Sequence, residues 1–461
     1  MANFFKENTK KKVNKQSNKL KQIHTIIIDK LDLNGSGVGR YQQKPIFVMG
    51  SLPNETVEIR ITEQKNKYIL AKLLKVNNAS KHRVVAQCQH FSRCGGCDLQ
   101  HLDYAEQLIF KQKKIVELFS RHGISNELLK QLSWQKPIQS SQWHYRRKAR
   151  IGVQFDKNSQ AIIGFRQKAT NQLVAIKSCP VLEKPADDIF PILKVLLAKL
   201  TVKKAIGHIE VISADNVDDK ANRLTLVVRQ IRPINTHDRQ LWQEYAKKHS
   251  WTVCFLENKK EQNSADEQAS TLAYELSYQL HDEIQIHFSN TDFIQINQQV
   301  NLAMIEQALA WLMPTSNDQV LDLFCGLGNF SLPLAKKVAK VVGVEGVQAM
   351  VDKAFANAKS NKIDNCQFYQ TDLNSEWLSN SWAKNNFTKV LLDPARAGAE
   401  QAVEQVSQLN IATILYVSCE PTTLARDSKI LLDKGYKISK IGLIDMFSQT
   451  KHVETMILFQ R

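Results

Sequence analysis

One cysteine near the end of the chain has the setting of a nucleophile. Cys419 follows an apolar run, Thr413–Val417, that we expect to be a buried parallel strand, and Pro421 stands where the first turn of a helix accepts proline. Open α/β folds bind ligands at the carboxyl ends of their strands, and a helix start favours thiolate over thiol. Cys419 is therefore a candidate nucleophile. The alternative is a core cysteine packed as a small hydrophobic residue, the commoner fate of a lone cysteine.

A second group of residues indicates an adenosyl ligand. After the predicted strand Gln319–Leu323, Gly326 and Gly328 let the backbone approach a ligand, as in dinucleotide-binding folds. Glu345 ends the next strand, where a carboxylate can hold a ribose diol, and Asp372 follows the third, where it could meet the adenine amino group. The third glycine of a dinucleotide loop is missing, which favours S-adenosylmethionine as the ligand.

A thiolate beside a methyl donor suits methylation of an electron-poor pyrimidine. The C5 of uracil is too weak a nucleophile to take a methyl group directly, but addition of the Cys419 sulfur to C6 makes C5 an enolate-like carbon that attacks the sulfonium. A general base must then remove the C5 proton so that the cysteine can leave. Glu454, at the start of the last predicted strand, is the preferred base, and His452 competes with it. Asp393, which ends a buried strand, could hydrogen-bond the target base or orient the donor.

Four cysteines have the spacing of a metal site. Cys88, Cys94 and Cys97 lie six and three residues apart in one loop, and Cys179 is followed by proline, as recurs in iron–sulfur loops. Four thiolates fit either zinc or a 4Fe–4S cluster, and the presence of a single CxxC pair favours iron–sulfur over zinc. Incidental cysteines are the remaining alternative. We expect a structural role for the cluster, because the proposed reaction moves no electrons.

Charge indicates a nucleic-acid partner. The formal net charge is +17 and the pI is near 9.4, which favours a polyanion. Basic and aromatic side chains are interleaved in the segment 143–150, which suits phosphate contact and base stacking; a solvated charged strand is an equally good interpretation. A target base in folded RNA must be unstacked before it reaches the pocket. Eight cysteines without an export signal, and no apolar run of about 20 residues, predict a cytoplasmic protein that does not span a membrane.

Four parts of the chain position these residues, so the fold class is multidomain. Residues 1–22 are rich in lysine and predict a disordered basic tail. Residues 23–76 contain short β-type runs and glycine-rich turns, which predict an OB-like β-barrel that binds RNA. Residues 77–290 are expected to form a central α+β domain with the cysteine loop and an RNA-binding surface. Residues 291–461 alternate strands with helices, which predicts a doubly wound, Rossmann-like α/β domain with an antiparallel edge.

With these residues in hand, the chain resembles the RNA uracil-C5 methyltransferase family over almost its whole length beyond the lysine tail. Residues 23–76 look like a TRAM domain, and the four cysteines match the ligands of the family's 4Fe–4S cluster. The catalytic-domain motifs that carry the resemblance are Asp292–Asn297, Asp322–Phe330, Leu392–Gly398, Ser418–Asp427 and His452–Glu454. A TRAM domain combined with a cluster is typical of the branch of the family that acts on 23S rRNA.

The resemblance implies a reaction and its residues. It implies methyl transfer from S-adenosylmethionine to C5 of a uridine in 23S rRNA, with Cys419 as nucleophile and Glu454 as base. It also implies donor contacts from Gln295, Phe324, Asn329, Glu345, Asp372 and Asp393. A monomer is the favoured oligomeric state.

The sequence departs from the family pattern at two positions, and other functions remain open. Glu420 stands where the family has asparagine, which puts a negative charge beside the thiol, and Ser448 stands where it has proline. The alternatives are uracil methylation at another rRNA site or in tRNA, cytosine-C5 methylation, and a non-catalytic iron–sulfur protein that binds RNA.

Overall fold

The computed structural model describes residues 22–215, 224–256 and 276–461. The basic tail predicted for residues 1–22 lies outside these ranges, apart from its last residue. Contacts divide the chain into two compact units, Met1–Lys111 with Gln449–Lys451, and Gln112–Ser448 with His452–Arg461. Each unit is described by itself below. The domain bounds derived from the sequence stay a prediction.

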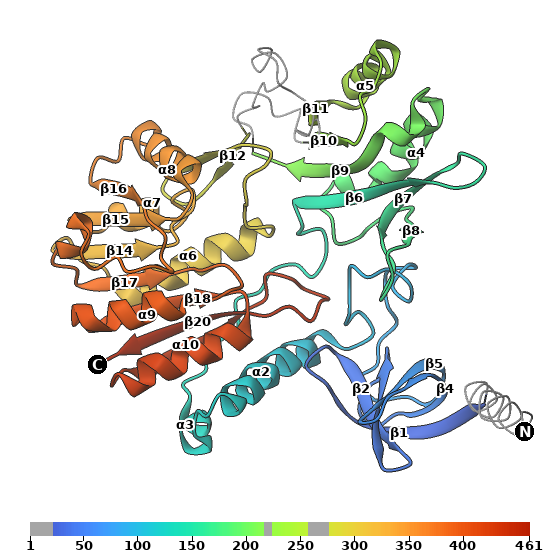
Figure 1. The fold of residues 1–461 in the computed structure, drawn as a ribbon, viewed down its shortest axis with the longest axis horizontal. Helices are drawn as coiled ribbons and strands as arrows, with labels where there is room; N and C mark the ends of the chain where they lie inside the picture. The colour runs from blue at the N-terminus through green and yellow to red at the C-terminus, as the bar shows by residue number, and fades with distance from the viewer. Residues whose placement is uncertain (1–21, 216–223, 257–275) are drawn as a thin grey trace, which may run out of the picture. The chain divides into compact units, whose positions relative to one another are not determined.

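The first unit contains the predicted barrel. Its strands are β1 (Ile23–Leu31), β2 (Ser36–Tyr41), β3 (Lys44–Met49), β4 (Thr56–Gln64) and β5 (Ile69–Asn78), which close in the order β1-β2-β3-β5-β4 (Figure 1). Alternate strand residues point inward and form a core that includes Ile28, Ile46 and Ile59. The glycine-rich turn is a packing requirement, because a Cβ at Gly37 would lie 2.1 Å from Ser51 Oγ. The barrel prediction is therefore confirmed.

The second unit begins with helices and a mixed sheet. The helices are α2 (Tyr104–Arg121, which starts in the first unit), α3 (Asn126–Gln131), α4 (Ile189–Lys199) and α5 (Thr236–His249). The strands are β6 (Lys148–Phe155), β7 (Ala161–Arg166), β8 (Leu173–Ala175), β9 (Ile206–Ser213), β10 (Leu224–Gln230) and β11 (Trp251–Leu256), in the order β11-β10-β9-β6-β7-β8. Helix α2 was missed from the sequence, although Ile115, Leu118 and Phe119 are buried at helical spacing.

The same unit ends in a seven-stranded sheet. Its strands are β14 (Gln319–Leu323), β15 (Lys340–Glu345), β16 (Cys366–Gln370), β17 (Lys389–Leu392), β18 (Thr413–Ser418), β19 (Lys437–Ile444) and β20 (Glu454–Gln460), in the order β16-β15-β14-β17-β18-β20-β19. Its helices are α6 (Gln298–Leu312), α7 (Ser331–Ala335), α8 (Gln348–Ser360), α9 (Glu400–Val406) and α10 (Pro421–Asp433). The hairpin β12 (Leu276–Gln279) and β13 (Gln285–Phe288) precedes it.

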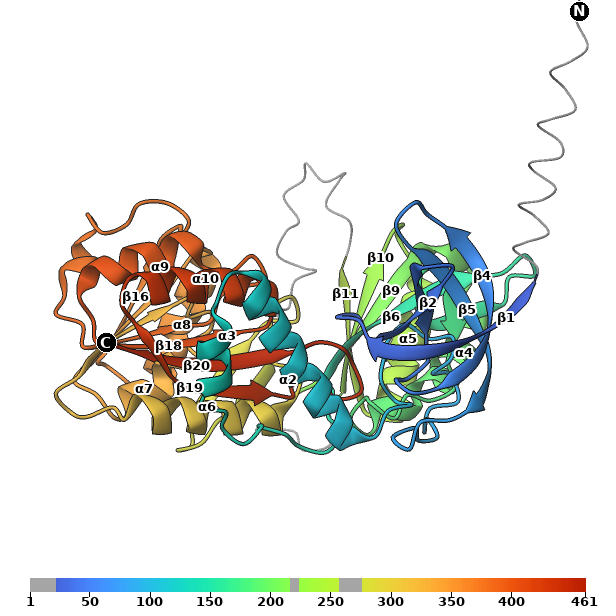
Figure 2. The ribbon, with the colours of Figure 1, turned by 90° about the horizontal axis from the view of Figure 1, so that it is seen from below.

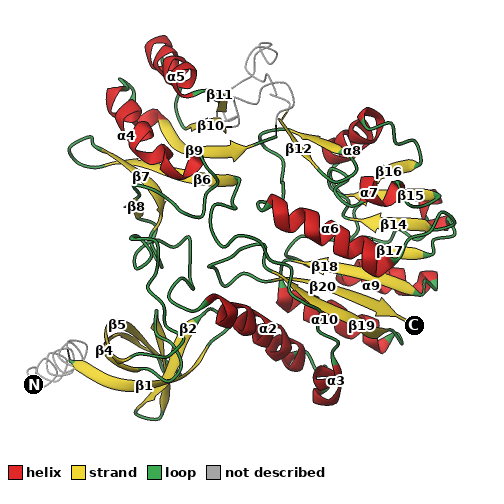
Figure 3. Ribbon diagram, turned by 180° about the vertical axis from the view of Figure 1, so that it is seen from behind, coloured by secondary structure: helices red, strands yellow, loops and turns green. Residues whose placement is uncertain are grey.

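This sheet has the predicted doubly wound form. Strands β14 to β18 pair in parallel, and β20 is antiparallel to both β18 and β19, which is the expected antiparallel edge. Helices α9 and α10 lie on one face and α6 and α7 on the other, as Figure 2 shows, and the same layering is seen from behind in Figure 3. The strand order reverses at β14, between β15 and β17, so the carboxyl edge there is where such folds bind ligands. Among the described residues, no helix is long and apolar enough to span a membrane.

Candidate active site

The glycine loop after β14 is folded against the end of β15. Phe324, Gly326 and Gly328 have φ values of 65°, 55° and 92°, in the left-handed region that a bulky residue such as phenylalanine rarely adopts. The loop is fixed because the Phe324 N–H donates to the carbonyl of Val344 at 2.8 Å. The Gly326 N–H donates to Glu345 Oε2 at 3.2 Å, so the loop and the acid predicted to hold a ribose are adjacent. Backbone strain of this kind is often found at ligand sites.

A part-buried amide pair orients Asn329. The Asn329 amide donates to Asn301 Oδ1 at 2.9 Å, and the Asn301 amide donates back to Asn329 Oδ1 at 3.0 Å. The Tyr278 hydroxyl donates to the same Asn329 oxygen, also at 3.0 Å. Sequence reasoning named Asn329 but missed Asn301 and Tyr278. A fully buried asparagine within the apolar face of α6 was the available signal.

Three acids lie along this edge in different environments. Burial raises the pKa of Asp322 to about 7, although Ser331 Oγ donates to it at 2.5 Å. Burial, and then the nearby charge of Asp322, raises the pKa of Asp393 to about 7. Asp372 is exposed after β16 and accepts a hydrogen bond from the Asn374 N–H at 3.0 Å. The chain therefore holds two carboxyl groups that titrate near neutral pH beside the glycine loop.

Strand register brings the predicted nucleophile and base together. Ser418 at the end of β18 pairs with Thr455 of β20 in antiparallel register, so the next residue, Cys419, extends toward Glu454. Glu454 is buried with 5% of its surface exposed, whereas His452 is exposed and its ring packs 5.7 Å from that of Phe447. This geometry favours Glu454 over His452 as the base.

The thiol of Cys419 is protonated at neutral pH. Burial raises its pKa to about 11, and the nearby charges of Glu454 and Asp393 add to the increase, while Arg396 opposes it. The expectation that the start of α10 would favour the thiolate is therefore outweighed. A helix terminus supplies a partial charge, but desolvation and two carboxylates act on the same sulfur.

A buried aspartate fixes the loop after β17 to helix α10. Asp427 accepts hydrogen bonds from the Ala399 N–H at 2.7 Å and from the Tyr416 hydroxyl at 2.6 Å. The neighbouring Arg426 donates to Asp427 Oδ1 at 2.8 Å and to the carbonyl of Ala397 at 3.1 Å. The carboxylate is completely buried and satisfied by these three donors, so the loop is held at its carboxyl end.

Gly398 closes the same loop against the helix. Its φ is +78°, and a Cβ at this position would lie 2.7 Å from atoms of three α10 side chains. Thr423 Oγ1 donates to the carbonyl of Arg396 at 3.3 Å. The Arg396 side chain is exposed on this fixed loop, near enough to Cys419 to lower the pKa of its thiol. Only glycine fits the turn without moving the loop.

Comparison with known proteins decides the family. Residues 103–461 match the family described as tRNA (Uracil-5-)-methyltransferase, and residues 19–74 match the TRAM domain. The chain belongs to the RNA uracil-C5 methyltransferase family. It is thus an RNA uracil methyltransferase, as the sequence motifs predicted.

Relatives of this RNA uracil-C5 methyltransferase extend over the whole chain. A protein of Colwellia psychrerythraea named 23S rRNA (uracil(1939)-C(5))-methyltransferase RlmD is 58% identical over 472 residues, covering 100% of this chain and 99% of its own. Proteins of the same name from Psychromonas ingrahamii and Aliivibrio fischeri are 44% and 41% identical, with 100% of both chains covered in each comparison. The Pyrococcus abyssi tRNA (uracil-54, C5)-methyltransferase, solved with S-adenosyl-L-homocysteine, shares the fold: its TM-score is 0.71 at 22% identity, over 95% of this chain and 100% of that one.

Glu420, the first of the two departures from the family pattern, acts as the N-cap of α10. Its carboxylate accepts a hydrogen bond from the Thr422 N–H at 3.2 Å. The pKa of Cys419 is raised mainly by burial, and then by the charges of Glu454 and Asp393. Asparagine caps helices equally well, so the departure keeps the local structure. At the second departure, Ser448 Oγ donates to Asp445 Oδ2 at 2.6 Å.

A substitution pair tests this capping role. We expect Glu420→Asn to leave the melting temperature and the alkylation rate of Cys419 unchanged, because the cap is kept and burial, Glu454 and Asp393 are the main causes of the raised pKa of the thiol. Glu420→Ala should destabilise the fold by about 1 kcal/mol through loss of the cap. Thermal unfolding and iodoacetamide labelling followed by mass spectrometry measure both effects. Faster labelling of Cys419 in the asparagine variant would show that the Glu420 charge reaches the sulfur.

The cysteine loop has local features that suit thiolate ligands. Cys94 is buried, its sulfur accepts a hydrogen bond from the Gly96 N–H at 3.4 Å, and a Cβ at Gly96 would lie 3.5 Å from that sulfur. Cys88, Cys94 and Cys97 belong to the first compact unit and Cys179 to the second, and none of the four is in a disulfide. Within the described ranges, no group of three or more histidine, cysteine or acidic side chains is arranged to hold a metal ion.

Proposed function

We propose that this protein transfers a methyl group from S-adenosylmethionine to C5 of a uridine in 23S rRNA through a covalent bond between Cys419 and C6 of the base. The observation that carries the proposal is the register of β18 and β20, which extends Cys419 toward the buried Glu454 at the edge that also bears the glycine loop. The 23S rRNA substrate is supported by the names of relatives aligned over the full chain. With that substrate, the cytoplasm is the expected compartment.

The reaction assigns a step to each of three groups. The Cys419 thiolate adds to C6, and the electrons of the C5–C6 double bond become an enolate. C5 then takes the methyl group from the sulfonium, which leaves as S-adenosylhomocysteine. Glu454 removes the C5 proton, the double bond re-forms and the thiolate departs. Because the pKa of Cys419 is about 11, its thiol proton must pass to solvent water as the uridine binds, and the Arg396 charge, which lowers that pKa, stabilises the resulting thiolate.

The donor is proposed to bind along the glycine loop. Glu345, beside the Gly326 N–H, would hold the ribose hydroxyls, and Asp372 at the rim would meet the adenine amino group. Asn329, held by its amide pair, would contact the methionine part. The remaining proposed donor contacts are Gln295, Phe324 and Asp393.

The two carboxyl groups with raised pKa values predict a pH dependence of donor binding. Asp322 and Asp393 have pKa values of about 7, so they lose their protons and become negative as the pH rises through neutrality. The donor carries a cationic sulfonium, so its affinity should increase between about pH 6 and about pH 7.5. Calorimetric titration measures this. Adenosine, which is uncharged in this range, is the control and should bind with constant affinity; a donor affinity that falls with pH would contradict the proposed role of the acids.

We propose that Cys88, Cys94, Cys97 and Cys179 hold a 4Fe–4S cluster as a structural element. The spacing, the absence of disulfides and the N–H···S bond from Gly96 to Cys94 support this assignment. Protein purified without air should be brown and contain iron, and Cys179→Ser should lose both colour and iron. A colourless protein with stoichiometric zinc would replace the cluster with a zinc site.

Mapping of modified nucleosides tests the function. In cells that lack this protein, 23S rRNA should lose one 5-methyluridine, and the wild-type gene should restore it. Mass spectrometry of nuclease fragments identifies both the base and the position. Loss of 5-methyluridine from tRNA, or of 5-methylcytidine, would overturn the assigned substrate. Unchanged RNA would overturn the proposed activity in the cell.

A further inference from the structure

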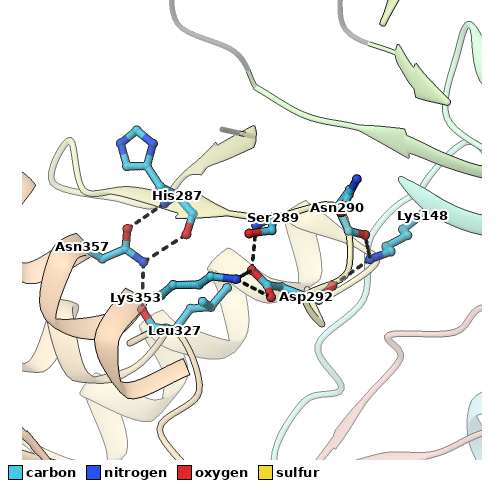
Figure 4. Close-up of polar contacts among 8 residues, drawn as sticks. All are labelled: Lys148, His287, Ser289, Asn290, Asp292, Leu327, Lys353 and Asn357. Carbon is cyan, nitrogen blue, oxygen red and sulfur yellow. Dashed lines mark hydrogen bonds and ion pairs between the residues drawn. The ribbon is translucent and has the colours of Figure 1, made fainter. Parts of the chain in front are cut away.

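The basic stretch that was a candidate RNA surface is partly turned into the protein. Lys148, the first residue of β6, donates through Nζ to the carbonyls of Asn290 at 3.0 Å and Asp292 at 2.7 Å (Figure 4). The preceding Arg147 is buried, with 3% of its surface exposed. Arg150, in contrast, is exposed and paired with Glu210. Lys148 and Arg150 therefore both bind other parts of this chain, and Arg147 is buried.

The segment that these cations hold carries a proposed donor contact. It joins β13 to α6 and includes Gln295. The Arg147 N–H donates to the carbonyl of Ile296, and its Nε donates to the carbonyl of Gln295, both at 2.9 Å. The Arg147 guanidinium also lies 4.6 Å from the ring centre of Tyr278, whose hydroxyl orients Asn329. Arg147 therefore binds the backbone of Gln295 directly. It also contacts Tyr278, whose hydroxyl donates to Asn329. Both Gln295 and Asn329 are predicted to contact the methyl donor.

Helix α8 holds the same segment from the other side. The Asp292 carboxylate accepts hydrogen bonds from Lys353 Nζ at 2.6 and 2.7 Å and from the Ser289 N–H at 2.6 Å. Asp292 is buried, with 8% of its surface exposed, while the Lys353 side chain is 32% exposed, so the carboxylate end of this ion pair lies inside the protein and the amine end reaches solvent. Figure 4 shows Lys148 and Lys353 approaching Asp292, one at its backbone and the other at its side chain. Asp292 is thus held at its backbone carbonyl by Lys148 and at its carboxylate by Lys353.

A second side chain of α8 extends this hold to the glycine loop. Asn357 is buried; its amide donates to the carbonyls of His287 and Leu327, both at 3.2 Å, and its oxygen accepts from the His287 N–H at 2.9 Å (Figure 4). Leu327 lies between the two glycines of the loop. Helix α8 therefore ties both walls of the proposed donor pocket, the Gln295 segment through Lys353 and the loop through Asn357.

We propose that Lys148 is a positioning residue for the methyl donor: together with the Asp292–Lys353 pair it holds the Gln295 segment in its binding position, and it does not bind RNA. Two of its three N–H donors are engaged by the backbone carbonyls of Asn290 and Asp292, so the amine is oriented toward this segment and one donor remains for any other partner. This inference rests on the proposed donor contact of Gln295.

The test measures donor and RNA binding separately on the full-length protein. Calorimetry with S-adenosylhomocysteine should show affinity reduced about tenfold in Lys148→Met and in Asp292→Asn, because each removes a charge-assisted contact to the segment. Filter binding of in vitro transcribed 23S rRNA should change less than about twofold in both. Lys148→Arg should restore most of the donor affinity, since it returns the charge and the donors. Arg150→Gln, two residues further along the stretch and exposed, is the matched control and should leave donor affinity unchanged.

Three results would overturn the proposal. One is weakened RNA binding in Lys148→Met with unchanged donor affinity, which would make Lys148 an RNA contact. Another is a lower melting temperature in Asp292→Asn with unchanged donor affinity and KM, which would give Lys148, Asp292 and Lys353 a purely structural role. The Asp292→Asn variant also decides the case if Lys148→Met does not fold. The third is a loss of donor affinity in Gln295→Ala with unchanged donor affinity in both Lys148→Met and Asp292→Asn. Unchanged affinity in Gln295→Ala would instead remove the proposed contact of Gln295 itself.

Discussion

Cys419→Ala will abolish RNA methylation, to less than about 10⁻⁴ of the wild-type rate, while S-adenosylhomocysteine still binds. Without the sulfur, C5 of uracil never becomes nucleophilic, so no other group on this edge can replace it. The proposed donor contacts Phe324, Asn329 and Glu345 lie along the glycine loop and at the end of β15, and alanine at position 419 leaves the hydrogen bonds of that loop in place. Transfer of tritium-labelled methyl groups to 23S rRNA measures the loss, and calorimetry measures the retained binding.

Trapping of the covalent protein–RNA adduct tests whether the Cys419 sulfur is the atom that adds to the base. RNA containing 5-fluorouridine cannot release the C5 substituent, so wild-type enzyme should form an adduct that survives denaturing electrophoresis. Cys419→Ala should form none. Cys254→Ala, which changes a buried cysteine of β11, is the matched control and should form the adduct normally. An adduct in Cys419→Ala, or residual turnover at the wild-type rate, would refute the covalent mechanism.

Glu454→Gln will lower turnover by about 10²- to 10⁴-fold and make the covalent intermediate accumulate with natural uridine RNA. The amide cannot accept the C5 proton, so methyl transfer proceeds but elimination of Cys419 stalls. Glutamine keeps the volume of this buried side chain, which limits the effect on folding. Denaturing electrophoresis with labelled donor detects the stalled adduct, since protein, RNA and methyl group migrate together.

His452→Ala supplies the comparison for the base. His452 is exposed two residues before Glu454, and its removal should change turnover less than about threefold and trap nothing. If His452→Ala instead accumulates the adduct and Glu454→Gln turns over normally, the two roles must be exchanged. Both variants retain Cys419, so either result leaves the nucleophile assignment intact.

The sequence was sufficient for features that depend on local order along the chain. Parallel strands end at one edge of a sheet, so placing Gly326, Glu345 and Cys419 at the carboxyl ends of three parallel strands already predicted that they share that edge. The closed barrel likewise followed from short alternating strands and glycine turns. These predictions needed strand identity and direction but no knowledge of side-chain contacts.

Features that depend on distant partners could not be predicted in the same way. The pKa of Cys419 is governed by burial and by Glu454, which only the pairing of β18 with β20 brings near, so the local rule about helix termini gave the wrong direction. Asn301 and Tyr278 reach Asn329 from separate elements. Lys148 alternates with aromatic and basic neighbours as an RNA-binding residue would, and only the fold reveals the carbonyls that it binds.

The anchoring of the loop that carries Arg396 affects how a substrate can enter. Gly398 packs closely against α10, and Asp427 accepts three hydrogen bonds, two of them from Ala399 and Tyr416. These contacts hold the loop after β17 in place, so we do not expect it to move as a lid. The RNA rather than the protein must then change conformation for a uridine to enter the site, and unstacking the target base requires a few kcal/mol. In a series of RNA hairpins, the methylation rate should therefore increase as the stacking and pairing around the target uridine become weaker.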